Sequence, residues 1–328
     1  MNACSDTLLR VSDLAVGFAD KAGLARAVDG VDFTLSGGRT FCLVGESGCG
    51  KSVTALALLH LLPRPAARVL SGSAEFEGKD LLALSEAEIN RVRGARIGMI
   101  FQEPLTSLNP VFSVGEQVAE PFRLHRGLSR KEALREAVRL LELVGIAGAA
   151  QRAGAYPHEL SGGMCQRVMI AMAVACEPKL LIADEPTTAL DASLQNQILD
   201  LLAELREKKG DSLLLITHDL DMVGRHADSL AVMYSGKIVE YGPARELLRN
   251  PAHPYTQGLL ASRPRFRPGQ KPGRLPAIAG SVPSPLLRPP GCAFSSRCLR
   301  ARRRCSREMP PLAGIGPGEE RCVRCWLA

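Results

Sequence analysis

The chain has 328 residues, 46% of them hydrophobic and 23% charged, which is typical of a globular protein with more than one domain. No apolar run approaches the ~18 residues that a membrane-spanning helix needs. The first residues, MNACSDTLLRVSDL, lack the basic stretch and apolar core of a secretion signal, so we expect a cytoplasmic protein.

The net charge of +7 is concentrated near the C-terminus, because 12 Lys and Arg residues and no Asp or Glu lie between residues 263 and 307. Such a basic segment suits anionic lipid headgroups, an acidic protein surface or nucleic acid. Aromatic residues make up only 4% of the chain, which leaves little material for stacking bases. We therefore expect no nucleic-acid partner.

Strand patterns surround a glycine-rich loop near the N-terminus. Residues 8–18 alternate apolar and polar side chains, and residues 28–35 predict a second strand. The apolar run 41–44 predicts a buried strand that leads into the octapeptide GESGCGKS at 45–52, and residues 53–62 predict a helix that follows it. This order of strand, loop and helix is the context of a phosphate-binding loop.

The octapeptide matches the pattern G-x-x-x-x-G-K-[ST] throughout, with Gly45, Glu46, Ser47, Gly48, Cys49, Gly50, Lys51 and Ser52 as candidate nucleotide-binding residues. Glycines allow successive N–H groups to point at phosphate oxygens at a helix N-terminus. Lys51 is expected to reach the β- and γ-phosphates, and the Ser52 hydroxyl to bind Mg²⁺. A chance glycine-rich turn is the alternative, which the flanking strand and helix disfavour.

Further strands are predicted at 72–76 and 96–101. The second ends at Gln102, whose amide is well placed to reach a metal ion or a water molecule. From residue 114 to 150 the apolar residues recur at helical spacing, which predicts a helical insertion.

The sequence LSGGM at 160–164 leads into a predicted helix over 166–176. Ser161, Gly162 and Gly163 at a helix start form a second phosphate-binding pattern. An apolar strand then ends at Asp184 and Glu185, which suit a Mg²⁺-associated acid and a base for the attacking water. A solvated acidic turn is the alternative, but it does not explain the apolar strand that precedes the two acids.

Asp191 precedes a predicted helix over 193–209, and the strand 212–217 ends at His218, which could donate to a γ-phosphate. A lone histidine is more often structural. Residues 230–234 and 237–241 predict a hairpin. Fourteen of the 22 prolines lie after residue 240, so we expect a separate, loop-rich element there.

Six motifs in this order resemble the ATP-binding subunit of an ABC transporter: Walker A GESGCGKS, the Q-loop Gln102, the signature LSGGM, Walker B LLIADE, the D-loop ending at Asp191 and the switch His218. NPAHPYT at 250–256, GSVPSP at 280–285 and GCAFSSRC at 291–298 resemble the C-terminal extension of dipeptide and oligopeptide importer ATPases. That subfamily also includes importers of nickel and other small solutes.

The resemblance implies an α/β fold, a P-loop NTPase of ABC type. It has an antiparallel β subdomain, a mainly parallel core sheet and a helical insertion at about 103–165. The predicted domains are an ABC ATPase domain at 1–243 and a Cys-containing extension at 244–328. The expected activity is ATP hydrolysis coupled to import of peptides. Import of nickel or another small solute is the alternative, and a soluble ABC ATPase not linked to transport is a weaker one.

The family also implies a head-to-tail dimer, in which Ser161 and Gly163 bind the partner's ATP. Spacing alone would equally allow Phe18 to be an ordinary core residue, whereas the resemblance implies that it stacks on adenine. Glu185, His218 and Gln102 would be catalytic, with Ser52, Gln102 and Asp184 around Mg²⁺. Expected partners are a second, homologous ATPase in a heterodimer, two transmembrane permease subunits and an extracytoplasmic solute-binding protein that acts indirectly. The chain would sit peripherally on the cytoplasmic face of the membrane. Cys165 departs from the polar residue common after the signature.

Five cysteines, Cys292, Cys298, Cys305, Cys322 and Cys325, lie in the last 37 residues. Disulfides are not expected in the cytoplasm, and a set of four thiolates suits zinc or an iron–sulfur cluster. The wide C-x₅-C-x₆-C spacing of the first three disfavours zinc. The resemblance implies a [4Fe–4S] cluster on Cys292, Cys298, Cys305 and Cys325, with Cys325 preferred over Cys322. Unligated thiols are the remaining alternative.

Overall fold

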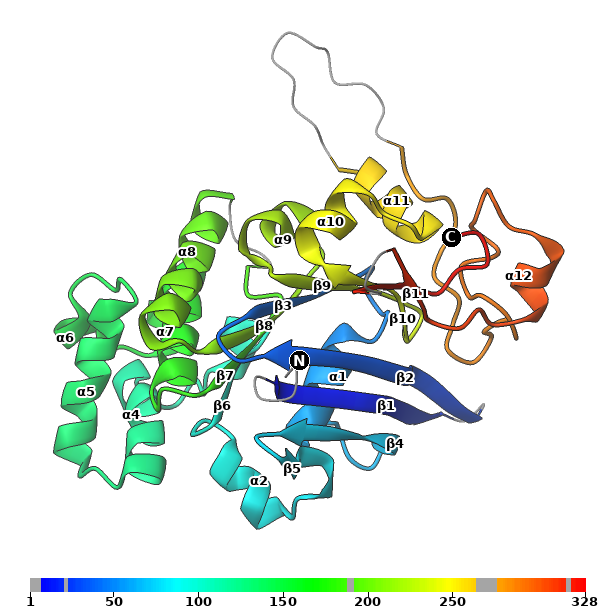
Figure 1. Ribbon diagram of the computed structural model, residues 1–328. Coiled ribbons are helices and arrows are strands. Elements are labelled where there is room, and N and C mark those ends of the chain that lie inside the picture. Colours follow the sequence, from blue (N-terminus) through cyan, green and yellow to red (C-terminus); the bar gives the residue numbers. More distant parts are fainter. Residues whose placement is uncertain (1–6, 21–22, 188–191, 264–275, 317–319) are drawn as a thin grey trace, which may run out of the picture. The chain divides into compact units, whose positions relative to one another are not determined.

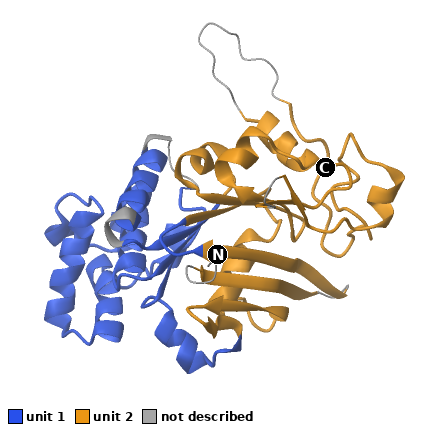
Figure 2. Ribbon diagram, in the orientation of Figure 1, with its two compact units in different colours: residues 1–6, 36–39, 83–216 blue, residues 7–35, 40–82, 217–328 orange. Residues whose placement is uncertain are grey.

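The computed structural model describes residues 7–20, 23–187, 192–263, 276–316 and 320–328 (Figure 1). Two compact units are coloured separately in Figure 2. Unit 1 comprises residues 1–6, 36–39 and 83–216, and unit 2 comprises residues 7–35, 40–82 and 217–328. Residues 217–328 all belong to unit 2, and the predicted domain boundary at 243/244 stays a prediction.

An antiparallel sheet in unit 2 has the strand order β2-β1-β4-β5, with the bounds β1 Thr7–Asp20, β2 Gly23–Ser36, β4 Ala67–Phe76 and β5 Lys79–Asp80. β1 and β4 pair with Leu9 opposite Phe76 and Phe18 opposite Ala67. The predicted strands at 8–18, 28–35 and 72–76 are confirmed, and the observed strands are longer. Leu9 and Val11 of β1 are buried, as the alternation in the sequence predicts.

The remaining strands of unit 2 lie in the order β11-β12-β10-β9-β3, with the bounds β3 Thr40–Val44, β9 Ser229–Tyr234, β10 Lys237–Pro243, β11 Ala313–Ile315 and β12 Arg321–Val323. β3 and β9 are parallel. The hairpin β9–β10 is confirmed, and its turn residues Ser235 and Gly236 both have positive φ (46° and 80°). β12 pairs with β10, so the C-terminal segment extends this sheet.

In unit 1 three parallel strands lie in the order β8-β7-β6, with the bounds β6 Ile97–Ile100, β7 Leu180–Asp184 and β8 Ser212–Thr217. Residue 217 is the first of unit 2. Every residue of β7 and β8 is buried, which explains their continuous apolar sequences. The carboxyl ends of β6 and β7 therefore meet at one edge.

Most of the helices of unit 1 belong to the predicted insertion and to the segments that follow it. Their bounds are α2 Glu86–Val92, α3 Pro104–Ser107, α4 Val114–Arg126, α5 Arg130–Leu143, α6 Ala149–Arg152, α7 Gly162–Val174 and α8 Ala192–Lys209. Ser129 and Glu132 form a capping box that starts α5. α4, α5 and α7 pack on one another, and α7 also packs on β6. The helical insertion is thus a helical layer of unit 1.

Unit 2 contains the helices α1 Lys51–Leu58, α9 Leu220–His226, α10 Ala244–Arg249, α11 Pro254–Ala261 and α12 Arg303–Arg307. α1 starts two residues earlier than predicted, since the helix begins inside the octapeptide, and it ends at Leu58 rather than at residue 62. α10 packs on β9 and β10. Within the described ranges, no helix has both the length and the apolar character required to cross a membrane.

Candidate functional site: a phosphate loop and a carboxylate edge

The octapeptide forms the turn between β3 and α1 in unit 2. Two of its glycines are required by close backbone approaches. A Cβ at Gly45 would lie 2.2 Å from the carbonyl oxygen of Met233, and one at Gly50 would lie 2.6 Å from that of Ala27. Gly50 also has φ 106°, which side-chain-bearing residues rarely adopt. The glycine pattern therefore reflects a tightly packed loop at a helix N-terminus, the geometry that suits a phosphate chain.

Lys51 is the first residue of α1 and is only 4% exposed. Its Nζ donates to the carbonyl oxygens of Gly45 (2.8 Å) and Glu46 (3.2 Å). These bonds hold the ammonium group inside the loop. Ser52 follows in the first turn and is half-buried. The loop thus presents a fixed cation and a hydroxyl, which fits the donors that phosphate and Mg²⁺ require.

Cys49 is a buried member of the loop. Burial raises the pKa of its thiol, although the neighbouring Lys51 acts in the opposite direction. Of the other loop residues, Glu46 is half-buried, and Ser47 and Gly48 are exposed.

The C-terminal segment contacts the loop at Glu46. The Glu46 N–H donates to the hydroxyl of Tyr255 (2.9 Å), and the Arg297 guanidinium contacts both carboxylate oxygens of Glu46 (3.0 and 3.2 Å). The sequence placed Tyr255 and Arg297 in motifs of the extension but gave neither a role. No local sequence signal could have revealed a contact between residues 251 positions apart.

Unit 1 contains the predicted carboxylates at the end of β7. Asp184 is the last residue of the strand, lies opposite Ile216 of β8 and is 4% exposed. Glu185 follows in a left-handed conformation (φ 45°), and its N–H donates to the carbonyl oxygen of Ile216 (2.9 Å). A non-glycine residue in this conformation is uncommon and is often found at functional sites.

The structure brings Gln102 and Glu185 together. Gln102 follows β6, and its Nε2 donates to Glu185 Oε2 at 3.4 Å. The two residues lie at the ends of neighbouring parallel strands, where ligands of such sheets bind. An amide beside a carboxylate at this edge can orient a water molecule.

The signature residues lie at the N-terminus of α7 in unit 1. Ser161 caps the helix by accepting a hydrogen bond from the Met164 N–H (3.3 Å), and both Ser161 and Gly162 are exposed. Gly163 is tightly packed, because a Cβ there would lie 2.4 Å from a side-chain carbon of Leu194. Exposed donors at a helix N-terminus can bind an anion that approaches from outside.

Cys165, the departure from the family pattern, faces inward. It is buried, and its thiol donates to the carbonyl oxygen of Pro157 (3.4 Å). Burial raises its pKa. The substitution therefore changes packing beneath the signature and leaves the exposed Ser161 and Gly162 in place.

Three further candidates have different surroundings. Phe18 is half-buried near the end of β1. His218 is exposed directly after β8, before Asp219, which caps α9. Asp191 lies outside the described residues.

Four of the five C-terminal cysteines line one pocket of unit 2: Cys292, Cys298, Cys305 and Cys325. Cys322 is not among the lining residues and instead lies in β12, opposite Tyr241. No group of three or more His, Cys, Asp or Glu side chains in the described ranges is arranged to hold a metal ion. The four thiols therefore gather without adopting ligand geometry.

Burial raises the pKa of two of these thiols, Cys292 and Cys325, and so favours their protonated form in the absence of a ligand. Burial raises the pKa of Cys292 to about 11, and the neighbouring Cys325, Cys305 and Cys298 contribute in the same direction. Backbone N–H groups donate to two of the sulfurs, from Arg302 to Cys305 and from Leu327 to Cys325 (both 3.4 Å). Such donors also suit thiolates, so the chemistry of the four sulfurs fits a thiolate-bound metal group, whereas their arrangement in the described residues does not.

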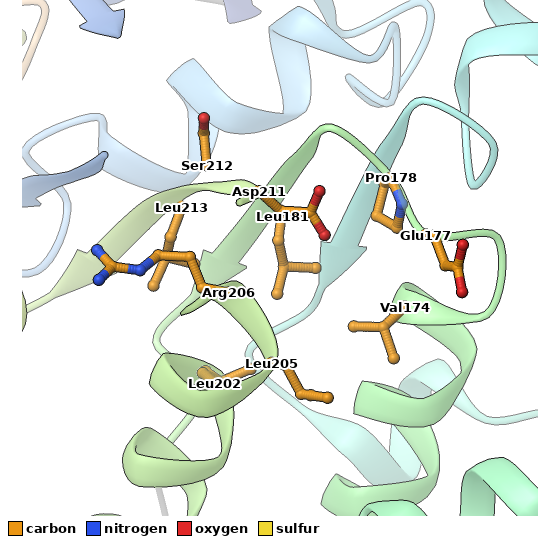
Figure 3. Close-up of a pocket in the computed structure, with 10 residues that line it drawn as sticks. All are labelled: Val174, Glu177, Pro178, Leu181, Leu202, Leu205, Arg206, Asp211, Ser212 and Leu213. Atoms are coloured by element: carbon orange, nitrogen blue, oxygen red, sulfur yellow. The ribbon is translucent and has the colours of Figure 1, made fainter. Parts of the chain in front are cut away.

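Unit 1 has a pocket of its own, which lies between the helices α7 and α8 and the strands β7 and β8 (Figure 3). Leu181, Leu202 and Leu205 form much of its lining. Leu181 and Ser212 are near the starts of their strands, so this pocket is at the edge opposite Asp184 and Glu185. We assign the pocket no part in nucleotide binding.

Comparisons with known proteins agree with these observations. The family model described as "ABC transporter" matches residues 28–188, and the model described as "Oligopeptide/dipeptide transporter, C-terminal region" matches residues 239–305. A peptide import ATP-binding protein of Brucella melitensis is 49% identical over 97% of both chains. The oligopeptide transport ATP-binding protein AppD of Bacillus subtilis is 48% identical over 98% of this chain and 97% of its own.

Among solved structures, the dimeric ATP-binding cassette MJ0796 bound to ADP and phosphate matches with a TM-score of 0.65 and 26% identity, covering 72% of this chain and 99% of that chain. The protein cbiO1 of Clostridium perfringens, part of the ABC transporter complex cbiONQ, gives 0.63 and 28%, covering 75% of this chain and 92% of its own. The predicted α/β fold of ABC type is confirmed. The chain belongs to the ABC transporter family, as an ATP-hydrolysing subunit that carries the C-terminal region of oligopeptide and dipeptide transporters.

Proposed function

We propose that this ATPase powers the import of di- or oligopeptides across the cytoplasmic membrane. The observation that carries the proposal is the match of residues 239–305 to the C-terminal region of oligopeptide and dipeptide transporters. The full-length relatives named for peptide transport, at 48–49% identity, support it.

Within the ATP site we assign residues 45–52 to the phosphates. Lys51, held between the carbonyls of Gly45 and Glu46, neutralises charge on the β- and γ-phosphates. Ser52, Asp184 and Gln102 would hold Mg²⁺, which supplies charge neutralisation on the phosphate oxygens when bound. Phe18 stacks on adenine.

The proposed catalytic step is the attack of a water molecule on the γ-phosphate. Glu185 accepts a proton from this water, and Gln102, which donates to the Glu185 carboxylate, fixes the orientation of that carboxylate. His218 donates to the γ-phosphate. The protein forms no covalent bond to the phosphoryl group in this step. Positioning of the water molecule and stabilisation of the charge on the phosphate therefore account for most of the rate enhancement.

The working assembly we propose is a head-to-tail heterodimer with a second, homologous ATPase. Ser161, Gly162 and Gly163 bind the partner's nucleotide. This role fits the exposed N-terminus of α7, whose donors are available to an approaching anion. Two transmembrane permease subunits complete the importer, an extracytoplasmic binding protein delivers solute, and the chain docks on the cytoplasmic face.

For the C-terminal pocket we propose a [4Fe–4S] cluster on Cys292, Cys298, Cys305 and Cys325, with zinc as the alternative. The common pocket and the two N–H···S contacts support these four residues as ligands. Iron and sulfide analysis of an anaerobic preparation tests the cluster. A brown protein with about four irons is expected, and a colourless, iron-free protein would overturn it.

Co-purification tests the importer itself. When a tagged form of this chain is purified from membranes solubilised in detergent, we expect two membrane subunits and a second ATPase to be purified with it. Its ATPase rate should rise when the cognate binding protein is added with peptides. Stimulation by nickel complexes alone would replace peptide with nickel as the solute, and isolation without any membrane subunit would contradict the importer.

A further inference from the structure

Glu46, the second residue of the phosphate loop, is held from two directions by the C-terminal segment. Arg297 Nη1 lies 3.0 and 3.2 Å from its two carboxylate oxygens, and the Tyr255 hydroxyl accepts a hydrogen bond from its N–H at 2.9 Å. All three residues belong to unit 2. Both the backbone and the side chain of one loop residue are therefore fixed by residues more than 200 positions away.

The Arg297 guanidinium is itself immobilised. Its Nε donates to the carbonyl oxygen of Ala279 (2.9 Å), its Nη2 to that of Ile278 (3.3 Å) and its Nη1 to the hydroxyl of Tyr234 (3.3 Å). The side chain is 5% exposed, whereas that of Glu46 is 29% exposed. Because Arg297 is buried and already held by these hydrogen bonds, forming its ion pair with Glu46 costs little side-chain conformational entropy. A pair of mobile surface side chains would lose more.

Aromatic packing holds the second contact in the same way. Tyr255 is fully buried, and burial raises the pKa of its hydroxyl, so the group remains a neutral acceptor for the Glu46 N–H at physiological pH. Its ring centroid lies 4.6 Å from that of Tyr234 and 5.3 Å from that of Phe294. The Arg297 guanidinium carbon lies 6.0 Å from the Phe294 ring centroid. Arg297 and Tyr255 thus act on Glu46 from one rigid cluster.

Glu46 transmits this constraint to the phosphate-binding cation. The carbonyl oxygen of Glu46 accepts a hydrogen bond from Lys51 Nζ (3.2 Å), and that of Gly45 accepts a second (2.8 Å). The position of Glu46 therefore bears on the Lys51 ammonium group and on the N–H groups that follow in the loop. A loop ordered before the nucleotide arrives binds more tightly, because less conformational entropy is lost on binding.

We propose that Arg297 is a positioning residue for ATP binding, which acts through Glu46 to hold the phosphate loop in its nucleotide-binding conformation. The C-terminal segment then contributes to ATP binding through Arg297, in addition to any role that its cysteines have. The inference rests on the proposed role of residues 45–52 in binding phosphates, and it does not depend on which solute is carried.

Equilibrium binding of Mg-ATP and steady-state ATPase kinetics of the full chain, in its purified complex, test the proposal. Arg297→Ala is expected to raise the Kd and KM for ATP about tenfold, the effect of losing roughly one charge-assisted hydrogen bond. The kcat should change far less, since the chemistry occurs at Glu185. Arg297→Lys should recover part of the affinity, because it keeps a charge near Glu46.

Glu46→Gln provides an independent variant on the loop side, which leaves the aromatic cluster intact. It should weaken ATP binding to a similar extent, and the double variant with Arg297→Ala should be no weaker than the worse single variant. Arg303→Ala, an exposed arginine in the same basic segment, is the matched control and should leave Kd and KM unchanged.

Unchanged ATP affinity in both Arg297→Ala and Glu46→Gln would overturn the proposal, as would fully additive effects in the double variant. A fall in Tm without a rise in KM would show a purely structural contact and would equally overturn it. Lys51→Ala separates this result from a failure of the loop assignment. If Lys51→Ala retains normal ATP binding, the role of the loop itself is wrong.

Discussion

Glu185 combines a carboxylate, an unusual backbone conformation and a neighbouring amide at the end of a buried strand. Its backbone is left-handed (φ 45°), and its carboxylate accepts a hydrogen bond from the Gln102 amide. This combination is what a base for an attacking water requires, because the carboxylate must be held and yet remain accessible.

Replacing Glu185 by Gln should separate ATP binding from hydrolysis. The amide keeps the size and the hydrogen bond to Gln102 but accepts no proton, so turnover should fall by about 10²–10⁴-fold. ATP affinity should be retained. Filter binding and phosphate release measure the two quantities, and near-normal phosphate release would remove Glu185 as the base.

The buried side chain of His253 should make the stability of the protein depend on pH. Burial lowers its pKa to about 4, from an ordinary value of 6.5. Its Nδ1 accepts a hydrogen bond from the Tyr255 N–H (3.0 Å), which requires the unprotonated nitrogen. The unfolded chain therefore binds more protons between pH 6.5 and 4, and the stabilising effect of neutral His253 is lost as the pH falls through this range.

The loss is at most about 3 kcal/mol, which is the pKa difference expressed as free energy. Chemical denaturation between pH 7 and 4 measures it. His253→Asn, whose amide oxygen can still accept from the Tyr255 N–H, should flatten this part of the profile. An identical pH profile in wild type and variant would show that His253 does not titrate as described.

At the scale of elements, the C-terminal hairpin β11–β12 is anchored to β10 by a buried ion pair. Glu240 is fully buried and accepts hydrogen bonds from the Ala252 and His253 N–H groups (2.8 and 3.0 Å) and from Arg321 Nη2 (3.1 Å). Arg321 belongs to β12, and its other Nη2 contact is the carbonyl oxygen of Asn250 (2.6 Å). One carboxylate therefore joins β10, the loop before α11 and the last strand.

Arg321→Ala should destabilise the protein strongly, by about 3–5 kcal/mol, because it leaves a buried carboxylate without its counter-charge. The control is Arg139→Ala on α5, which breaks the ion pair between Arg139 and Glu136. The Arg139 side chain is 73% exposed. That change should cost no more than about 1 kcal/mol. Equal Tm values for the two variants would contradict the anchoring role of Arg321.

The elements differ in how far the sequence could predict them. β7 and β8 are buried on both faces, so their continuous apolar sequences predicted them. The glycines near Lys51 predicted the loop between β3 and α1. The addition of β12 to the edge of β10 was not visible, because three-residue strands carry almost no periodic signal. One strand of the loop-rich element expected from the proline content, β12, pairs with the sheet of unit 2.

At the scale of the whole molecule, the sequence motifs identified the residue types of the ATP site but not what holds them. The sequence placed Gln102 and Glu185 each at the end of a strand, but that these two strands are parallel neighbours is shown only by the structure. The contact between Arg297 and Glu46 could not be predicted from the sequence, because it depends on how a loop without regular structure folds back over unit 2. Long-range polar contacts of this kind have no local signature.

The central claim is that ATP hydrolysis by this chain drives peptide uptake. The most direct measurement is accumulation of a labelled tripeptide in vesicles that contain the complete complex, its binding protein and ATP on the side of this chain. Wild type should accumulate peptide only with hydrolysable ATP, and Lys51→Ala should not accumulate it. ATP-dependent peptide uptake that persists in Lys51→Ala, or uptake of a nickel complex with none of peptide, would contradict the account.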